Sequence, residues 1–142
     1  MSAYVNVKTN ITDLTCLIEA LKEFGWEPVI HEEAAPLTGY TGDVRKQKAH
    51  VIVPRKQIGR VSNDLGFLRN GDGSYSMVIS QYDQVHIPTS KGLKDLQAFQ
   101  GAVTQKYAVS KAMANAKKLG LSIQSQETTA SGEVKIVVRR WK

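Results

Sequence analysis

The stretch that most limits the fold is residues 101–119, a run with helical periodicity that ends at Gly120 and precedes two short β runs. An α-helix advances about 100° per residue, so the side chains separate onto two arcs. One arc is apolar and mostly alanine, which predicts that this helix lies close against a sheet. The apolar arc holds Ala102, Ala108, Val109, Ala112, Met113, Ala116 and Leu119, and the opposite arc holds Val103, Lys106, Tyr107, Ser110, Lys111, Lys117 and Lys118.

A second amphipathic helix is predicted near the N-terminus. Thr12 or Asp13 can cap its start, and Gly25 suits the left-handed residue after its end. Cys16 falls on the polar side of this helix beside acidic side chains that disfavour a thiolate, so we do not expect a reactive nucleophile. The apolar stripe has i, i+3, i+4, i+7 spacing and consists of Leu14, Leu17, Ile18, Leu21 and Phe24.

The rest of the chain contains short β-rich runs. Leu93, Leu96 and Phe99 indicate one or two helical turns before the long helix, and residues 84–92 are expected to form a loop. The order β-α-β-β-β-β-α-β-β predicts a single α+β domain, residues 1–142, in which two main helices pack on one face of an antiparallel sheet. The expected strands cover about residues 2–10, 26–33, 50–53, 65–69, 74–83, 121–126 and 133–140, with a turn at 70–73.

Charge is unevenly distributed along the chain. Residues 1–83 carry 9 Lys and Arg against 10 Asp and Glu, whereas residues 84–142 carry 10 against 3. A basic half of this kind indicates an acidic partner, of which nucleic acid is the commonest, although a merely solvated basic face has the same composition.

Several classes of protein are disfavoured by the sequence. No apolar run approaches the ~18 residues that cross a bilayer, and the N-terminus lacks the layout of a signal or transit peptide. A single cysteine cannot form an internal disulfide framework. We therefore expect a soluble protein of the cytoplasm, or of the plastid stroma if it is plastid-encoded.

Residues 34–48 are expected to form a loop, because Pro, Gly and Thr are frequent there. Gly39 and Gly42 flank Tyr40, and Arg45 and Lys46 follow. The spacing matches neither a Walker loop nor a dinucleotide-binding loop. An exposed hairpin or connection with an aromatic tip is the preferred interpretation, and such a tip can serve as a contact site.

Candidate catalytic and metal sites are weak. In His31-Glu32-Glu33, neighbouring strand residues point to opposite faces, so they do not converge on one ion. Ser, His and Asp occur without a nucleophile-elbow motif. We expect no catalytic residue, cofactor or metal, but a pocket that joins Asp64, Asp83 and His86 would indicate a small enzyme.

The basic C-terminal half offers the strongest case for binding. Its cationic side chains can neutralise phosphates or carboxylates, and Tyr107 and Trp141 can stack on bases. In the alternative, Trp141 covers a core edge and Tyr107 packs at a helix–loop junction. The cationic set is Lys106, Lys111, Lys117, Lys118, Lys135, Arg139 and Arg140.

With these segments placed, the chain resembles the hypothetical chloroplast open reading frame thirty-five family of plastids, cyanobacteria and other bacteria. The insertion around 54–63 and the Tyr82-Asp83 pair, where the family tends toward tryptophan, depart from its pattern. The resemblance rests on Val7-Lys8-Thr9-Asn10-Ile11 with Asp13-Leu14, on Leu21-Lys22 with Gly25-Trp26, on Gly39-Tyr40 with Gly42 before Ala49 and Val51-Ile52, on Leu65-Gly66-Phe67 with Gly71 and Tyr75, and on Gln105-Lys106-Tyr107-Ala108 with the closing Val-Val-Arg-Arg-Trp.

The resemblance implies a small soluble protein without an assigned activity and provides no catalytic residue. Some bacterial relatives accompany ATPases of the AAA type, which suits an adaptor. We therefore expect a non-enzymatic binding or adaptor module that docks on an acidic partner or assembly. The alternative is binding of RNA or single-stranded DNA. The expected contact residues are Tyr40, Arg45, Lys46, Lys106, Tyr107, Lys111, Lys118, Lys135, Arg139, Arg140 and Trp141.

Overall fold

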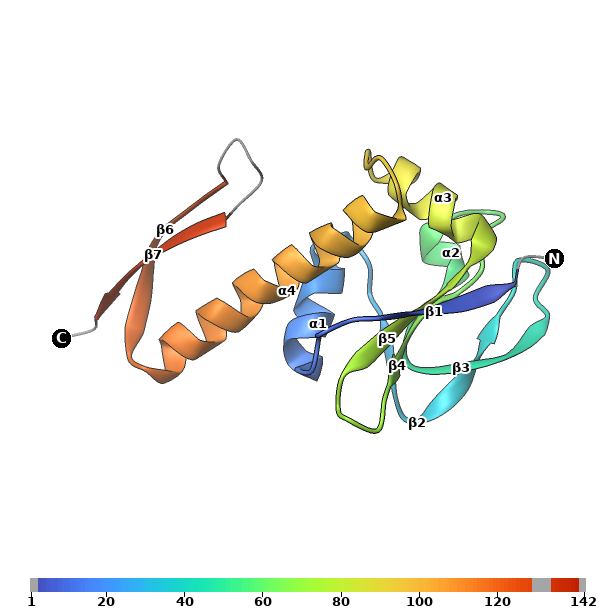
Figure 1. Ribbon diagram of the computed structural model, residues 1–142, viewed down its shortest axis with the longest axis horizontal. Helices are drawn as coiled ribbons and strands as arrows, with labels where there is room; N and C mark the ends of the chain where they lie inside the picture. The colour runs from blue at the N-terminus through green and yellow to red at the C-terminus, as the bar shows by residue number, and fades with distance from the viewer. Residues whose placement is uncertain (1–2, 129–133, 141–142) are drawn as a thin grey trace.

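The computed structural model of the chain describes residues 3–128 and 134–140 (Figure 1). Its helices and strands alternate along the chain much as the sequence predicts. In order they are β1 (Tyr4–Lys8), α1 (Leu14–Lys22), β2 (Val29–Thr38), β3 (Val44–Val53), α2 (Arg55–Ile58), β4 (Leu65–Arg69), β5 (Tyr75–Ser80), α3 (Gln81–Ser90), α4 (Leu96–Lys118), β6 (Leu121–Thr128) and β7 (Val134–Arg140).

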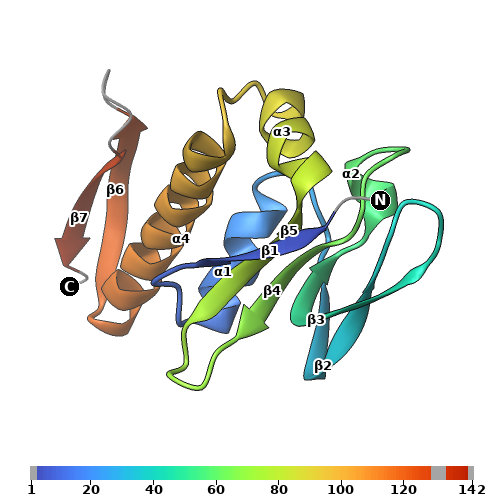
Figure 2. The same cartoon turned by 45° about the vertical axis from the view of Figure 1, so that its right-hand side comes forward.

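The strands form two antiparallel sheets. The larger has five strands in the order β1-β5-β4-β3-β2, and β6 pairs only with β7 in a separate two-stranded sheet. The α+β class with an antiparallel sheet is therefore confirmed. The C-terminal hairpin does not extend the main sheet, because α4 stands between them (Figure 2).

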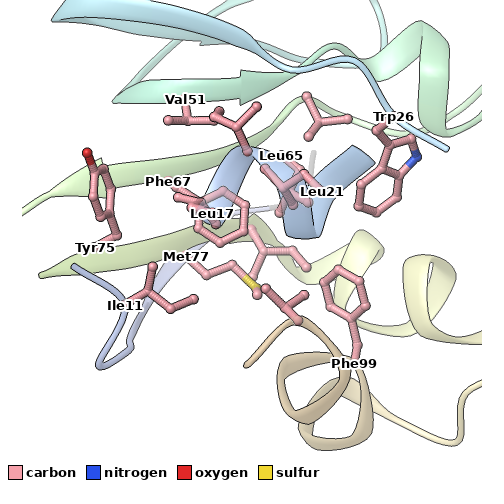
Figure 3. Packing of buried hydrophobic residues seen from close by; sticks show 14 of the residues in the cluster. Ile11, Leu17, Leu21, Trp26, Val51, Leu65, Phe67, Tyr75, Met77 and Phe99 are labelled. Carbon is pink, nitrogen blue, oxygen red and sulfur yellow. The ribbon is translucent and has the colours of Figure 1, made fainter. Parts of the chain in front are cut away.

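One face of the five-stranded sheet carries the main core (Figure 3). Phe67 of β4 and Met77 of β5 pack beneath Leu17 of α1 and Phe99 of α4, and all four side chains are fully buried. The Asp13 side chain accepts a hydrogen bond from the Cys16 N–H, with 3.1 Å between Oδ1 and N, so α1 starts where its cap predicts. Helices α1 and α4 cover this face together with α3.

The opposite face is covered by the β2–β3 hairpin, which bends back over the sheet. The Arg45 guanidinium of β3 lies 5.1 Å from the centre of the Tyr4 ring, although β1 is at the far edge of the sheet. Gly66 lies beneath this hairpin, where a Cβ atom would stand 2.6 Å from the Ala49 Cβ. The second cluster consists of Tyr4, Leu37, Ala49, Ile52 and Val78.

The prediction of a loop over 34–48 is wrong for most of that range, because β2 and β3 together occupy 29–38 and 44–53. The preferred interpretation, an exposed hairpin with an aromatic tip, is confirmed. Gly42 has a φ of 86° in the turn, and the Tyr40 side chain is 44% exposed at the tip.

The segment 81–92 also differs from the prediction of a strand end and a loop. Strand β5 ends at Ser80, and α3 begins there because the Ser80 hydroxyl accepts a hydrogen bond from the Asp83 N–H. The helix has no continuous apolar stripe, and Pro88 lies inside it. Periodicity therefore gave no sign of this helix.

Helix α4 is longer than predicted and rotated differently. It starts at Leu96, with Asp95 as its cap, and it buries Phe99 and Val103. Ala108 and Ala112, which were expected to face the core, are exposed. An aromatic side chain buries 150–250 Å², far more than alanine, so Phe99 and Tyr107 determine which side faces α1.

Cys16 is only 3% exposed, so its placement on the outer side of α1 is also wrong. Helix α4 packs over that side, where Lys111 pairs with Asp13. Within the described residues, α4 and the other helices lack the combination of length and apolarity that a membrane crossing requires.

Candidate functional site

The outer side of α4 is the most distinctive surface of the molecule. Helix α4 lies between the main body on one side and the β6–β7 hairpin on the other (Figures 1 and 2). Its inner side packs on α1, while Ala108, Ala112 and Met113 remain exposed. β6 begins three residues after α4 ends, so the hairpin turns back beside this outer side.

A groove of about 1280 Å³ runs between α4 and the hairpin. Its lining is mostly small or apolar, and β7 contributes Val134 and Ile136 as the second wall. We call it the α4 groove. Small-molecule sites usually have 300–1,000 Å³, so this groove is larger than a site for a compact ligand. On the helix side it is lined by residues that include Ala98, Gly101, Ala102, Ala108, Val109 and Ala112.

A smaller hollow of about 400 Å³ lies where α1 meets α4 and the hairpin. Glu19 and Glu23 of α1 line it together with Lys106, and it shares Val109 and Val134 with the α4 groove. The hairpin is thus bordered by open space on both sides of its contact with α4.

The charges around the groove are mostly positive. Residues 91–120 include six lysines and one aspartate. Lys117 and Lys118 are exposed in the last turn of α4, and Lys135 is exposed between the two apolar residues of β7. These three predicted cations are exposed on α4 and β7, the two elements that line the groove.

Two other predicted cations, Lys111 and Lys106, make contacts with side chains of the protein itself. The Lys111 Nζ lies 3.0 Å from Asp13 Oδ2, and this carboxylate raises the pKa of the lysine. The pKa of Asp13 is lowered by the hydrogen bond from the Cys16 N–H and then by Lys111. Lys106 Nζ lies 5.1 Å from the centre of the Phe24 ring. The expected row of outward-facing lysines is therefore only partly present.

Tyr107 also differs from the role of a base-stacking residue. Its hydroxyl oxygen accepts hydrogen bonds from the backbone N–H groups of Thr12 and Asp13, at 3.2 and 3.0 Å. The side chain packs against the main core. The alternative of packing at a helix–loop junction is confirmed for Tyr107.

The predicted surface also includes Arg139, Arg140 and Trp141 at the C-terminal end of the chain. Arg139 and Arg140 belong to β7, and the structure describes their backbone but not their side chains. Trp141 lies outside the described residues.

The predicted contact site around Tyr40 lies at the opposite end of the molecule from the α4 groove (Figure 1). The Arg45 side chain is held between the Tyr4 ring and Asp43, whose Oδ2 is 3.8 Å from Arg45 Nε. Lys46 is exposed. The two halves of the predicted surface are therefore separate sites.

Asp64, Asp83 and His86 come from neighbouring segments, and the two carboxylates accept hydrogen bonds from backbone N–H groups. Asp64 accepts hydrogen bonds from the N–H groups of Arg55 and Thr38 at 2.7 and 2.8 Å. Asp83 accepts from the Asn63 N–H at 2.9 Å, and its burial raises its pKa. These contacts anchor residues 54–64 to the sheet.

The segment that contains His31, Glu32 and Glu33 lies in an irregular part of β2. Residues 31–34 bulge out of β2, since they fall between Ile30 and Ala35 where β3 has a single residue. Among residues 3–128 and 134–140, no group of three His, Cys, Asp or Glu side chains is placed to hold a metal ion.

Comparison with known proteins identifies the family. The model described as "Protein of unknown function (DUF1257)" matches residues 20–137. The chain belongs to the DUF1257 family. It is also similar to the uncharacterized protein ycf35 of Pyropia yezoensis, with 25% identity over 143 residues that cover 99% of this chain and 98% of that protein. The resemblance predicted from the sequence is confirmed.

The region shared with DUF1257 proteins includes every residue that lines the α4 groove, from Leu93 to Ile136. No solved structure is significantly similar to the chain. Sequence reasoning missed the groove because it assigned Ala102, Ala108 and Ala112 to the core. Extending the helix upstream to Phe99 would have placed Phe99, Val103 and Tyr107 on one side and the alanines on the other.

Proposed function

We propose that this DUF1257 protein is a non-enzymatic docking module, and that it binds an acidic protein partner through the α4 groove. One observation carries the proposal: the groove is lined mostly by small and apolar residues, is not filled by the described residues, and lies in the most basic part of the chain. Buried apolar contact would supply affinity, and the lysines would favour an acidic partner.

A protein partner fits these features better than a nucleic acid. Single-strand binders usually combine cations with accessible aromatic faces. Here Tyr107 is bonded to the start of α1, and Lys111 is paired with Asp13. The groove itself presents aliphatic side chains and three glutamines. RNA or single-stranded DNA remains the alternative, because Lys117, Lys118 and Lys135 are exposed.

The family resemblance to proteins that accompany AAA-type ATPases supports an assembly of this kind as the partner. We do not propose the Tyr40 tip as a contact with this partner, because it lies at the other end of the molecule from the α4 groove. The proposal for the α4 groove does not depend on the Tyr40 tip.

Site-specific photo-crosslinking in the native host tests the proposal. A benzoylphenylalanine at Ala112, which lines the groove, is compared with one at Val44, which is 76% exposed at the far end. We expect a discrete protein adduct only from position 112, and we expect charge reversal by Lys117→Glu and Lys118→Glu to reduce it strongly.

Two results would contradict the proposal. Equal adducts from positions 112 and 44 would mean that the groove is not a specific site. Adducts that nuclease removes, together with binding of an oligonucleotide that weakens steeply between two salt concentrations, would favour the nucleic-acid alternative instead.

A further inference from the structure

We infer, on the basis of the proposed docking function, that the segment bound in the α4 groove is an amphipathic α-helix. It lies along α4, its large apolar side chains pack on the small residues of the groove, and carboxylates flank its apolar face. The length of the groove, the internally bonded backbone of its α4 wall and the charge of the surrounding segment lead to this inference.

The groove follows α4 for about four helical turns. From Ala98 to Ala112 the axis advances about 21 Å at 1.5 Å per residue. Small residues recur along this length at Gly101, Ala102 and Ala108. Two helices whose contact side chains are small approach to the lower end of the usual 8–10 Å axial separation, and larger side chains of the partner then fill the holes.

A helix is favoured over an extended segment because of backbone hydrogen bonding. The backbone N–H and C=O groups along this part of α4 are used within the helix. An extended segment lying along α4 would therefore find no backbone partners on the helix wall of the groove. A helix satisfies its own backbone, and Val134 and Ile136, on one face of β7, add apolar contact from the other wall.

A second copy of this chain is a poor occupant. If two α4 helices packed through this side, either antiparallel or parallel, lysines of one would approach lysines of the other. The segment 91–120 has six lysines against the single acid Asp95. Like charges disfavour that pairing, and a helix with glutamates or aspartates beside its apolar face is favoured.

The test uses the full chain and a fluorescein-labelled model peptide of about 18 residues, long enough to cover four turns. Leucines at i, i+3, i+4 and i+7 form one face, and glutamates flank it. Three control peptides have scrambled leucine positions, lysines in place of the glutamates, or a central proline that prevents a helix. We expect saturable binding of the first peptide alone, with increased helical circular dichroism.

Matched protein variants test whether the peptide occupies the groove. Ala108→Gln with Ala112→Gln places larger polar side chains on two exposed groove positions. Asn115→Gln, also exposed on α4 but outside the groove lining, is the control. We expect the double variant to weaken binding about tenfold or more, because it blocks close approach of the helices. The control should change affinity by less than about twofold.

Several results would overturn the inference. Equal binding of the proline or scrambled peptide would exclude a bound amphipathic helix, and unchanged binding by the double variant would exclude the groove. A chain that sediments as a dimer, and is dissociated by Ala108→Gln with Ala112→Gln, would identify a second copy as the occupant. If position 112 crosslinks to a protein while the Leu/Glu peptide does not bind, the proposed docking function is kept and the inference of a bound helix is wrong. If position 112 gives no adduct and the peptide does not bind, the proposed function fails as well.

Discussion

The hydroxyl oxygen of Tyr107 lies 3.0 Å from the backbone nitrogen of Asp13, a residue 94 positions earlier in the chain. The same oxygen accepts the Thr12 N–H, so one side chain of α4 satisfies two backbone donors at the start of α1. This contact joins the helix that borders the α4 groove to the main body. It also removes Tyr107 from the surface available to a partner.

Replacing Tyr107 with phenylalanine is expected to destabilise the protein by about 1 kcal/mol, because the part-buried Asp13 N–H and the exposed Thr12 N–H lose their acceptor while the ring stays in place. Urea unfolding monitored by circular dichroism measures this change. Tyr40→Phe, at a side chain that is 44% exposed, is the matched control and should have little effect. Equal stability of the Tyr107→Phe variant would show that water replaces the hydroxyl without cost.

Removing the Asp13 carboxylate is expected to cost about 1 kcal/mol at pH 7 in Asp13→Ala, because α1 loses its N-cap. Since folding lowers the pKa of Asp13, the carboxylate stabilises the protein above about pH 4, and this contribution is lost as the pH falls through the folded-state pKa. Asp13→Ser keeps a cap without charge. Its unfolding free energy should show less dependence on pH below about 4 than that of the original chain.

The buried carboxyl of Asp83 has the opposite pH dependence. Folding raises its pKa, so the folded state holds the proton more tightly, and that stabilisation is lost as the pH rises from about 4 through the folded-state pKa. Asp83→Asn keeps an oxygen that can accept the Asn63 N–H. We expect the stability of this variant relative to the original chain to improve between pH 4 and pH 7 in urea titrations. A difference in unfolding free energy between the two proteins that stays constant over this pH range would contradict the expectation.

Gly66 is required by the close approach of the β2–β3 hairpin. A Cβ atom there would lie 2.6 Å from the Ala49 Cβ and 3.0 Å from Leu37 Cδ2, so Gly66→Ala is expected to destabilise the protein by about 1–3 kcal/mol. Gly71→Ala, where no atom lies within 4 Å of the added methyl group, is the control. Thermal unfolding of the two variants should differ in midpoint by several degrees.

The orientation of α4 can be tested by stability alone. Phe99→Ala is expected to cost about 3–5 kcal/mol because the ring is fully buried. Ala112→Gln, at an exposed position that the alanine-rich arc would bury, should change stability by less than about 0.5 kcal/mol. A large loss from Ala112→Gln would mean that the alanine side faces the core after all.

Local signals predicted much of the fold. The Asp13 cap and Gly25 defined α1, and the 70–73 turn defined the β4–β5 hairpin, where Gly73 has a φ of 89°. These features depend on neighbouring residues, so the sequence is sufficient to find them. The α+β class followed from their order along the chain.

The errors arose where distant residues decide the structure. Helix α3 depends on a cap from Ser80 and on burial of Asp83 and Ile87, without a stripe that periodicity can detect. The side of α4 that faces the body depends on Phe99 and Tyr107 meeting α1, which local sequence does not specify. The α4 groove escaped prediction for the same reason, because alanines on a helix are compatible with either a buried or an exposed side.

The pairing of β1 has a consequence for how the chain is completed during translation. Tyr4 in β1 pairs with Ser80 at the end of β5, 76 residues later. At 5–20 residues per second, a ribosome needs about 4–15 s to add those residues. All four strands from β2 to β5 have been synthesised before β1 can pair, because its partner in the sheet is β5. Strand β1 is therefore placed on the sheet after β2 to β5 have been synthesised, and until then it depends on not pairing elsewhere.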